Sequence, residues 1–278
     1  MVYFKIIVFL SLIISPIQSY ANEAESVCLT LVSNNQCLKA LEVCRVDAEL
    51  GDPKAQTALS MLLSGITHGD FRKNYKQSFY WVKQAAEQGY SKAELAIAEM
   101  YMNGVVIPMN AKKAKVWYEK AAAQENLNGV NGLARQYRYG TGVRKDYEKA
   151  FQYYQQAALE GHTRSQVGLG LSYRDAKGVN KNMVKAYAWI LIAAEKIDKQ
   201  QLQAIEERYK DERENLDQTM PQCKHLSRLE QMSEIMTTGY AQRILLDLKQ
   251  RMSIKQINKA KKLALEIKKE RAFTRSVL

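Results

Sequence analysis

Cysteine and histidine are the residues of this chain whose possible chemistry depends most on their spacing. There are four cysteines, Cys28, Cys37, Cys44 and Cys223, and three histidines, His68, His162 and His225. The cysteine intervals fit no zinc-ligand pattern, and each histidine is isolated in sequence from a plausible nucleophile. No GxSxG, HExxH or phosphate-loop motif occurs, and Gly168 and Gly170 fall inside a predicted helix, where glycine permits close packing. We therefore predict a protein that is not an enzyme, with no catalytic centre, no metal site and no cofactor.

The N-terminus has the order of a secretory signal. Lys5 precedes the apolar run from Ile6 to Ile14, and Ser19-Tyr20-Ala21 has the small-x-small pattern of a cleavage site. The run is shorter than the about 20 apolar residues that span a bilayer, which favours cleavage near Ala21 over a membrane anchor. No later segment is apolar enough to span. We predict a signal peptide and a mature chain that is periplasmic or secreted.

Export would make the cysteines candidates for disulfide bonds, because all four lie in the mature chain and the compartment would be oxidising. Cys37 and Cys44 are seven residues apart on a helix predicted from Leu38 to Leu50, so they share a face but lie too far apart to bond each other. We expect Cys28 to pair with Cys37 or Cys44. The remaining cysteine would pair with Cys223 or stay free.

The chain repeats with a period of 36 residues. The period is marked by four aromatic anchors, each followed four residues later by an alanine pair: Trp81, Trp117, Tyr153 and Trp189. A fixed period of this length is typical of a solenoid, in which each unit buries its apolar face only against its neighbours. We predict that each anchor ring fills space between stacked layers.

Each unit is predicted to form a helix, a turn and a second helix. The first helix is clearest from Ala93 to Asn103, where apolar residues recur at steps of three and four, and Gly104 ends it. The second helix follows a capping residue in every unit: Asn74, Asn110, Asp146 and Asn182. Its predicted core stripe in the second unit is Ala114, Trp117, Ala121 and Ala122.

These patterns resemble the Sel1-like repeat family, α-solenoid relatives of the tetratricopeptide repeat proteins. The matching stretches include Tyr137 to Ala150, Trp117 to Ala122 and Ala85 to Gly89, and the resemblance covers residues 51–196. It implies an all-α fold, a right-handed α-solenoid of helix-turn-helix repeats with helical N- and C-terminal caps. It also implies a protein that binds other proteins.

The predicted organisation has four parts. They are a signal peptide (1–21), an N-terminal helical cap (22–50), four repeats (51–88, 89–124, 125–160 and 161–196) and a basic C-terminal helical cap (197–278). A stripe of apolar residues suits the last part to cover the end of the array: Ile254, Ile257, Ala260, Ala264 and Ile267.

Positive charge is concentrated at the C-terminus. The formal net charge is +12, and residues 243–278 hold eleven Lys or Arg against three Asp or Glu. Such a tail could contact anionic lipid, polysaccharide or an acidic protein, and it also has the composition of a solvated helical face. No motif for reading bases accompanies the charge, so we expect no nucleic acid partner.

The family resemblance places a binding surface on the concave side, which is lined mainly by first helices. The positions that it directs outward are Glu99, Met102, Arg135, Arg138 and Arg174. For any single one, an ordinary solvated position is an equally good interpretation. We predict an exported protein-protein interaction adaptor or scaffold. The alternatives are an immunity protein that neutralises a secreted toxin such as a phospholipase effector, and an envelope-glycan-associated or hydrolytic protein that uses the basic tail.

Overall fold

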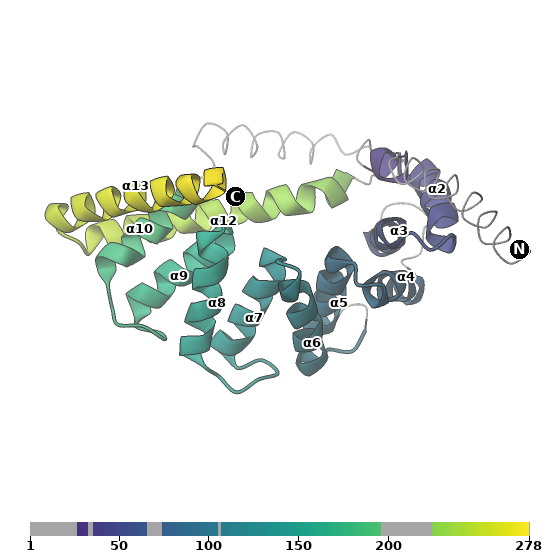
Figure 1. Ribbon diagram of the computed structural model, residues 1–278, viewed down its shortest axis with the longest axis horizontal. Helices are drawn as coiled ribbons and strands as arrows, with labels where there is room; N and C mark the ends of the chain where they lie inside the picture. Colours follow the sequence, from purple (N-terminus) through teal and green to yellow (C-terminus); the bar gives the residue numbers. More distant parts are fainter. Residues whose placement is uncertain (1–26, 33–35, 66–73, 105–106, 196–223, 278) are drawn as a thin grey trace, which may run out of the picture. The chain divides into compact units, whose positions relative to one another are not determined.

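A computed structural model describes residues 27–32, 36–65, 74–104, 107–195 and 224–277 (Figure 1). Every regular element in these ranges is an α-helix, in agreement with the predicted all-α class. The predicted signal peptide (1–21), residues 197–223 of the predicted C-terminal cap, which include Cys223, and the side chain of Cys37 lie outside the described part of the structure.

The described helices belong to two compact units. The first unit contains α2 (Cys37–Glu49), α3 (Pro53–Gly65), α4 (Tyr75–Glu87) and α5 (Ser91–Asn103). The second contains α6 (Ala111–Ala123), α7 (Leu127–Tyr139), α8 (Tyr147–Leu159), α9 (Thr163–Asp175), α10 (Met183–Ala194), α13 (Ile254–Val277) and most of α12 (Lys224–Gln250). From α2 to α5 and again from α6 to α10, each helix packs against the next one in the chain (Figure 1). This neighbour-to-neighbour packing is that of a solenoid.

Side-chain caps begin the second helices, as the sequence predicts. Asn74, Asn110, Asp146 and Asn182 each accept a hydrogen bond from the backbone amide three residues later. Such a cap satisfies one of the amides that have no partner within the helix. At the other end of the first helices, Gly104, Gly140 and Ala176 all adopt left-handed backbone conformations.

In the second and third repeats, the ring that fills the core stands one residue after the predicted anchor. Tyr118 and Tyr154 are 5% and 4% exposed, whereas Trp117 and Tyr153 are only partly buried. The predicted core stripe was therefore right for Ala114 and Ala121 and wrong for Trp117 and Ala122, which are both half-buried. Among the four anchors, Trp189 is buried and Trp81 is partly buried.

Glycines on the following first helix explain why these tyrosines point inward. A Cβ at Gly132 would lie 2.5 Å from the Tyr118 ring, and a Cβ at Gly168 would lie 2.6 Å from the Tyr154 ring. Each glycine thus provides the space that the ring occupies. In the first unit, 36 residues earlier, Val82 stands at the position of Tyr118 and Ala96 at the position of Gly132. There the smaller side chain of Val82 leaves space for an alanine.

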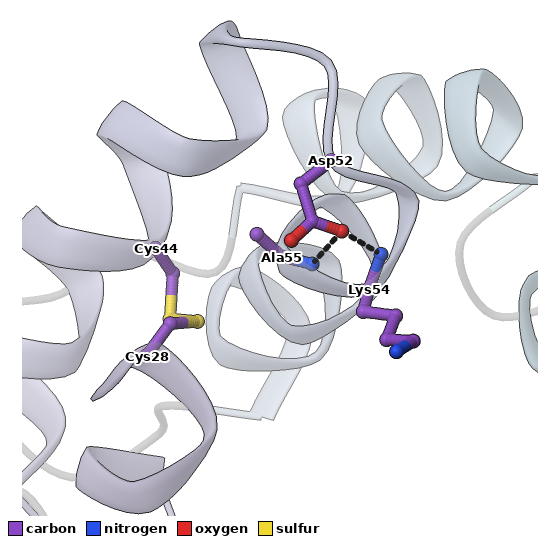
Figure 2. The surroundings of a disulfide bond; sticks show 5 residues. All are labelled: Cys28, Cys44, Asp52, Lys54 and Ala55. Atoms are coloured by element: carbon purple, nitrogen blue, oxygen red, sulfur yellow. Dashed lines mark hydrogen bonds between the residues drawn. A yellow bond between two sulfur atoms is a disulfide. The ribbon is translucent and has the colours of Figure 1, made fainter. Parts of the chain in front are cut away.

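A disulfide joins Cys28 to Cys44 across a sequence separation of 16 residues (Figure 2). Both cysteines are fully buried, and the bond ties the helical segment at residues 27–32 to α2. This pairing is one of the two expected for Cys28. In the same unit Asp52 accepts hydrogen bonds from the amides of Lys54 and Ala55, which begins α3 (Figure 2).

Helix α13 lies along α10 and packs against it (Figure 1). Ile257, Ala260 and Ala264 are buried in the core of the second unit, and Ile267 packs against it. Ile254 was wrongly predicted as part of this stripe, because its side chain is 78% exposed. None of the described helices combines the length and the apolar character needed to cross a membrane.

Candidate protein-binding groove

The five positions predicted to face a partner do not lie on one surface within either unit. Glu99 and Met102 belong to the first unit, and the three arginines belong to the second. Arg135 is exposed and Arg174 is half-buried. The outward placement of Arg138 was wrong: it is only 8% exposed. Its guanidinium turns toward Asp175 at the end of α9 and lies over the Tyr139 ring, 5.9 Å from the ring centre.

A groove of about 220 Å³ lies between α7 and α9, the first helices of two consecutive repeats. Helix α7 lines it with Asn131, Arg135, Arg138 and Tyr139, which are spaced i, i+4, i+7 and i+8 and therefore share one helical face. Helix α9 contributes Arg164, Gly168 and Leu171 at i, i+4 and i+7, and Tyr154 of α8 also lines the groove.

Three arginines and no acidic residue line this groove. The carboxylate of Asp175 pairs with one groove arginine: its Oδ1 lies 2.7 Å from Nε of Arg174, and its Oδ2 lies 3.9 Å from Nη2 of Arg138. The hydrogen bond from Arg174 holds the pKa of Asp175 below its usual value, so this carboxylate is ionised and already engaged. The groove is therefore a locally positive site.

Tyr154, which lines the groove, stays protonated at neutral pH. Burial raises the pKa of Tyr154 to about 12, and the nearby positive charges of Arg138 and Arg135 oppose that rise only in part. At neutral pH the Tyr154 hydroxyl can therefore donate a hydrogen bond. Beside it, Nη1 of Arg138 is buried without a hydrogen-bond partner in the described structure.

His162 takes part in a hydrogen-bond chain that the sequence does not reveal. Its Nδ1 accepts from the Ser165 amide at 3.3 Å and lies 2.9 Å from Oγ of Ser165, and its Nε2 lies 3.1 Å from Oδ1 of Asn128. Ser165 is fully buried, and its Oγ also accepts from Nδ2 of Asn131 at 2.9 Å. Because substrate cannot reach this hydroxyl, we assign His162 the structural role of capping α9.

The described ranges contain no group of three or more His, Cys, Asp or Glu side chains arranged to hold a metal ion. The charged groove residue that the sequence did not predict is Arg164, in the first turn of α9, and the uncharged ones include Asn131, Tyr139 and Tyr154. Its spacing from Gly168 and Leu171 puts Arg164 and these two residues on one face of α9, and only the packing of the helices brings that face to Arg135 and Arg138.

Comparison with known families decides what this helical array is. The Sel1 repeat matches four times, at residues 53–90, 91–126, 129–162 and 163–198, which together make up slightly more than half of the chain. The chain belongs to the Sel1 repeat family. Proteins of this family generally mediate protein-protein interactions and are generally scaffolds or adaptors rather than enzymes.

Solved structures show the same similarity. A protective antigen of uropathogenic Escherichia coli that displays an SLR fold is 30% identical, with a TM-score of 0.54, over 62% of this chain and 36% of its own. A Sel1 repeat protein from Oxalobacter formigenes is 28% identical, with a TM-score of 0.56, over 60% of this chain and 68% of its own. The match thus spans about a third of the antigen's length. No curated protein matches the sequence significantly.

Proposed function

We propose that this Sel1 repeat protein is an exported adaptor that binds another protein through the groove between α7 and α9. The groove supports this function because it collects three arginines, Tyr139 and an amide side chain from the first helices of adjacent repeats, with Tyr154 of α8 beside them. Arginine and tyrosine are enriched at protein-binding hot spots. The family supports the same class of function, since its members generally mediate protein-protein interactions.

Export is supported by two separate features. The first 21 residues have the order of a cleaved signal peptide. The disulfide between Cys28 and Cys44 is typical of a chain that folds in an oxidising compartment. Fractionation of the native cell should place the protein in the periplasm or the medium, with Asn22 as its N-terminal residue. Recovery of the uncleaved chain in the cytoplasm would refute export.

A photo-crosslinker inside the groove tests partner binding directly. Tyr139 lines the groove and is 64% exposed, so the larger p-benzoylphenylalanine can replace it with its added ring in solvent. Leu159 of α8 is an exposed control in the same unit that does not line the groove. We expect one dominant protein adduct in the cell envelope from position 139 and none from position 159. Equal adducts from both positions, or none from either, would remove the groove as the binding site.

A narrower form of this function is immunity against a secreted toxin such as a phospholipase effector. A small, basic chain without a recognisable catalytic motif would suit an inhibitor. In this case the captured partner should be an enzyme whose activity falls when the complex forms. A partner that retains full activity in the complex would leave the general adaptor function in place and refute immunity.

The basic C-terminal helix is the basis of an envelope-glycan alternative. Lys255, Lys259 and Lys262 of α13 are exposed, so they are available to a polyanion. Truncation is a poor test, because α13 also buries Ile257 and Ala260 in the core of the second unit. Reversal of the three lysines to glutamate should abolish cell-wall binding if this alternative holds, with melting unchanged. Cell-wall binding that survives the reversal would refute it.

A further inference from the structure

The arginine groove has the chemistry to select one kind of partner segment. We propose that the groove between α7 and α9 recognises a carboxylate side chain in an acidic segment of the partner protein, held by Arg135, Arg138 and Arg164. This inference rests on the proposed function and specifies the chemistry of the partner. It follows from charge, from hydrogen-bonding capacity and from the size of the groove.

The charge of the groove is only partly balanced within the described structure, because Arg138 shares its one nearby carboxylate, Asp175, with Arg174. All three charged residues that line it are arginines. Asp175, the carboxylate nearest to Arg138, already pairs at 2.7 Å with Arg174. Like charges held together in a partly desolvated groove repel one another, and an anion that enters relieves this repulsion.

Arg138 supplies the second observation. Its side chain is more than nine-tenths buried and lines the groove, yet Nη1 has no hydrogen-bond partner in the described structure. Its Nη2 lies 3.9 Å from Asp175, which is too long for a hydrogen bond. A buried guanidinium donor without an acceptor is costly, and a carboxylate can accept two parallel hydrogen bonds from such a group.

The size of the groove favours a side chain over a free small molecule. Its volume is about 220 Å³. Typical small-molecule sites are larger, with volumes of about 300 to 1,000 Å³. Asp and Glu side chains fit such a space while the rest of the partner stays outside. Tyr154 also lines the groove, and its protonated hydroxyl is a hydrogen-bond donor for an entering oxygen.

The test uses the full mature chain and two fluorescent peptides. One peptide alternates glutamate with serine, and the other has glutamine in place of every glutamate. The variants are Arg135→Gln and Arg164→Gln, both at exposed groove positions. The control is Arg144→Gln, which removes the same charge from an exposed position outside the groove in the same unit. Thermal melts establish that each variant is folded.

We expect the glutamate peptide to bind more tightly than the glutamine peptide by fluorescence anisotropy. Each groove variant should weaken that binding by about tenfold, the effect of losing one charge-assisted hydrogen bond, and Arg144→Gln should change it little. Equal weakening by Arg144→Gln would reduce the effect to general electrostatic attraction and overturn the proposal. So would equal binding of the two peptides or no binding of either. Arginine-dependent binding of inorganic phosphate in place of the peptide would assign the groove to phosphate.

The same variants separate this inference from the proposed function. If Arg135→Gln/Arg164→Gln still forms the protein adduct through position 139, the adaptor function stands and carboxylate recognition is wrong. If the glutamate peptide binds in an arginine-dependent way but no protein adduct forms in the cell envelope, the groove chemistry stands and the adaptor function is wrong.

Discussion

The contact between the Tyr118 ring and Gly132 predicts how a substitution at Gly132 changes the free energy of unfolding. Alanine usually stabilises the interior of a helix over glycine by about 1 kcal/mol. At Gly132 the added Cβ would lie 2.5 Å from the buried ring of Tyr118, far inside van der Waals contact. Overpacking of this kind costs about 1 to 3 kcal/mol. We therefore expect Gly132→Ala to destabilise the second unit by up to about 2 kcal/mol, after the gain in helix propensity is subtracted.

The chain itself suggests the compensating change. In the first unit the equivalent positions hold Val82 and Ala96, 36 residues before Tyr118 and Gly132. Tyr118→Val alone should cost about 2 to 4 kcal/mol, because truncation of a buried ring leaves a cavity. In the double variant Tyr118→Val/Gly132→Ala the new methyl group fills part of that cavity. We expect the double variant to be more stable than the sum of the single variants predicts by about 1 to 3 kcal/mol.

A matched control isolates the contact with the ring. Gly239 of α12 has no atom within 4 Å of its hypothetical Cβ and no positive φ, so Gly239→Ala should gain only the helix propensity. Urea denaturation followed by circular dichroism would give the free energies of unfolding, and hydrogen exchange in α6 and α7 would show where stability changes. Additivity within about 0.5 kcal/mol would refute the ring-glycine pairing. Stabilisation by Gly132→Ala would refute it as well.

The remaining predictions concern the first unit and one tight turn. Reduction of the disulfide between Cys28 and Cys44, which closes a separation of 16 residues, should cost the first unit about 3 kcal/mol, measured by melting with and without reductant. Burial and then the charge of Asp52 raise the pKa of Asp47, so folding favours its protonated form. The stability gained from protonated Asp47 is complete below the pKa of Asp47 in the unfolded chain and is lost as pH rises through its pKa in the folded chain. Asp47→Asn should therefore raise Tm at neutral pH and have little effect below about pH 4. Gly178→Ala should cost about 3 kcal/mol or more in urea denaturation, because φ is +75° and the new Cβ would meet the Tyr147 carbonyl oxygen at 2.0 Å. Gly51→Ala, with φ +97° and no atom within 4 Å, should show the backbone strain alone, and equal costs at the two sites would refute the contact at Gly178.

The sequence predicts the local features of this fold well because they depend on neighbouring residues. The caps at Asn74, Asn110, Asp146 and Asn182 need only an acceptor side chain before an amphipathic stretch. The period of 36 residues likewise follows from repetition and needs no knowledge of contacts between helices.

The inward ring could not be chosen from the period alone. In the second and third repeats two aromatic residues are adjacent, as in Trp117 and Tyr118. Both residues recur after 36 positions, so the period does not show which of the two rings is buried. The choice depends on which one faces a glycine of the next helix, 14 residues away at Gly132. The half-buried Trp117 instead lies beneath Lys120, whose Nζ is 4.1 Å from the ring centre. Glycine positions on the following helix were therefore the informative signal.

The arginine groove was only partly predictable for a related reason. Arg135 and Arg138 are on one helix, so their shared face can be seen from their spacing. Arg164 joins them only because α8 places α9 beside the same groove, and that depends on tertiary packing. The burial of Arg138 also depends on contacts outside its own helix, since its charged partner Asp175 is at the end of α9.

The same residues link core packing to the shape of the groove. Gly168 and Tyr154 both line the groove, and the ring of Tyr154 occupies the space that a Cβ on Gly168 would need. The part of the groove that these two residues line is therefore fixed by the contact that holds α8 against α9, and it cannot change without loss of stability. Arg135, Arg164 and Tyr139 are exposed at the rim, where substitution costs the core little. Selectivity for a partner must then come from these exposed residues, because the part of the groove lined by Tyr154 and Gly168 is fixed by helix packing.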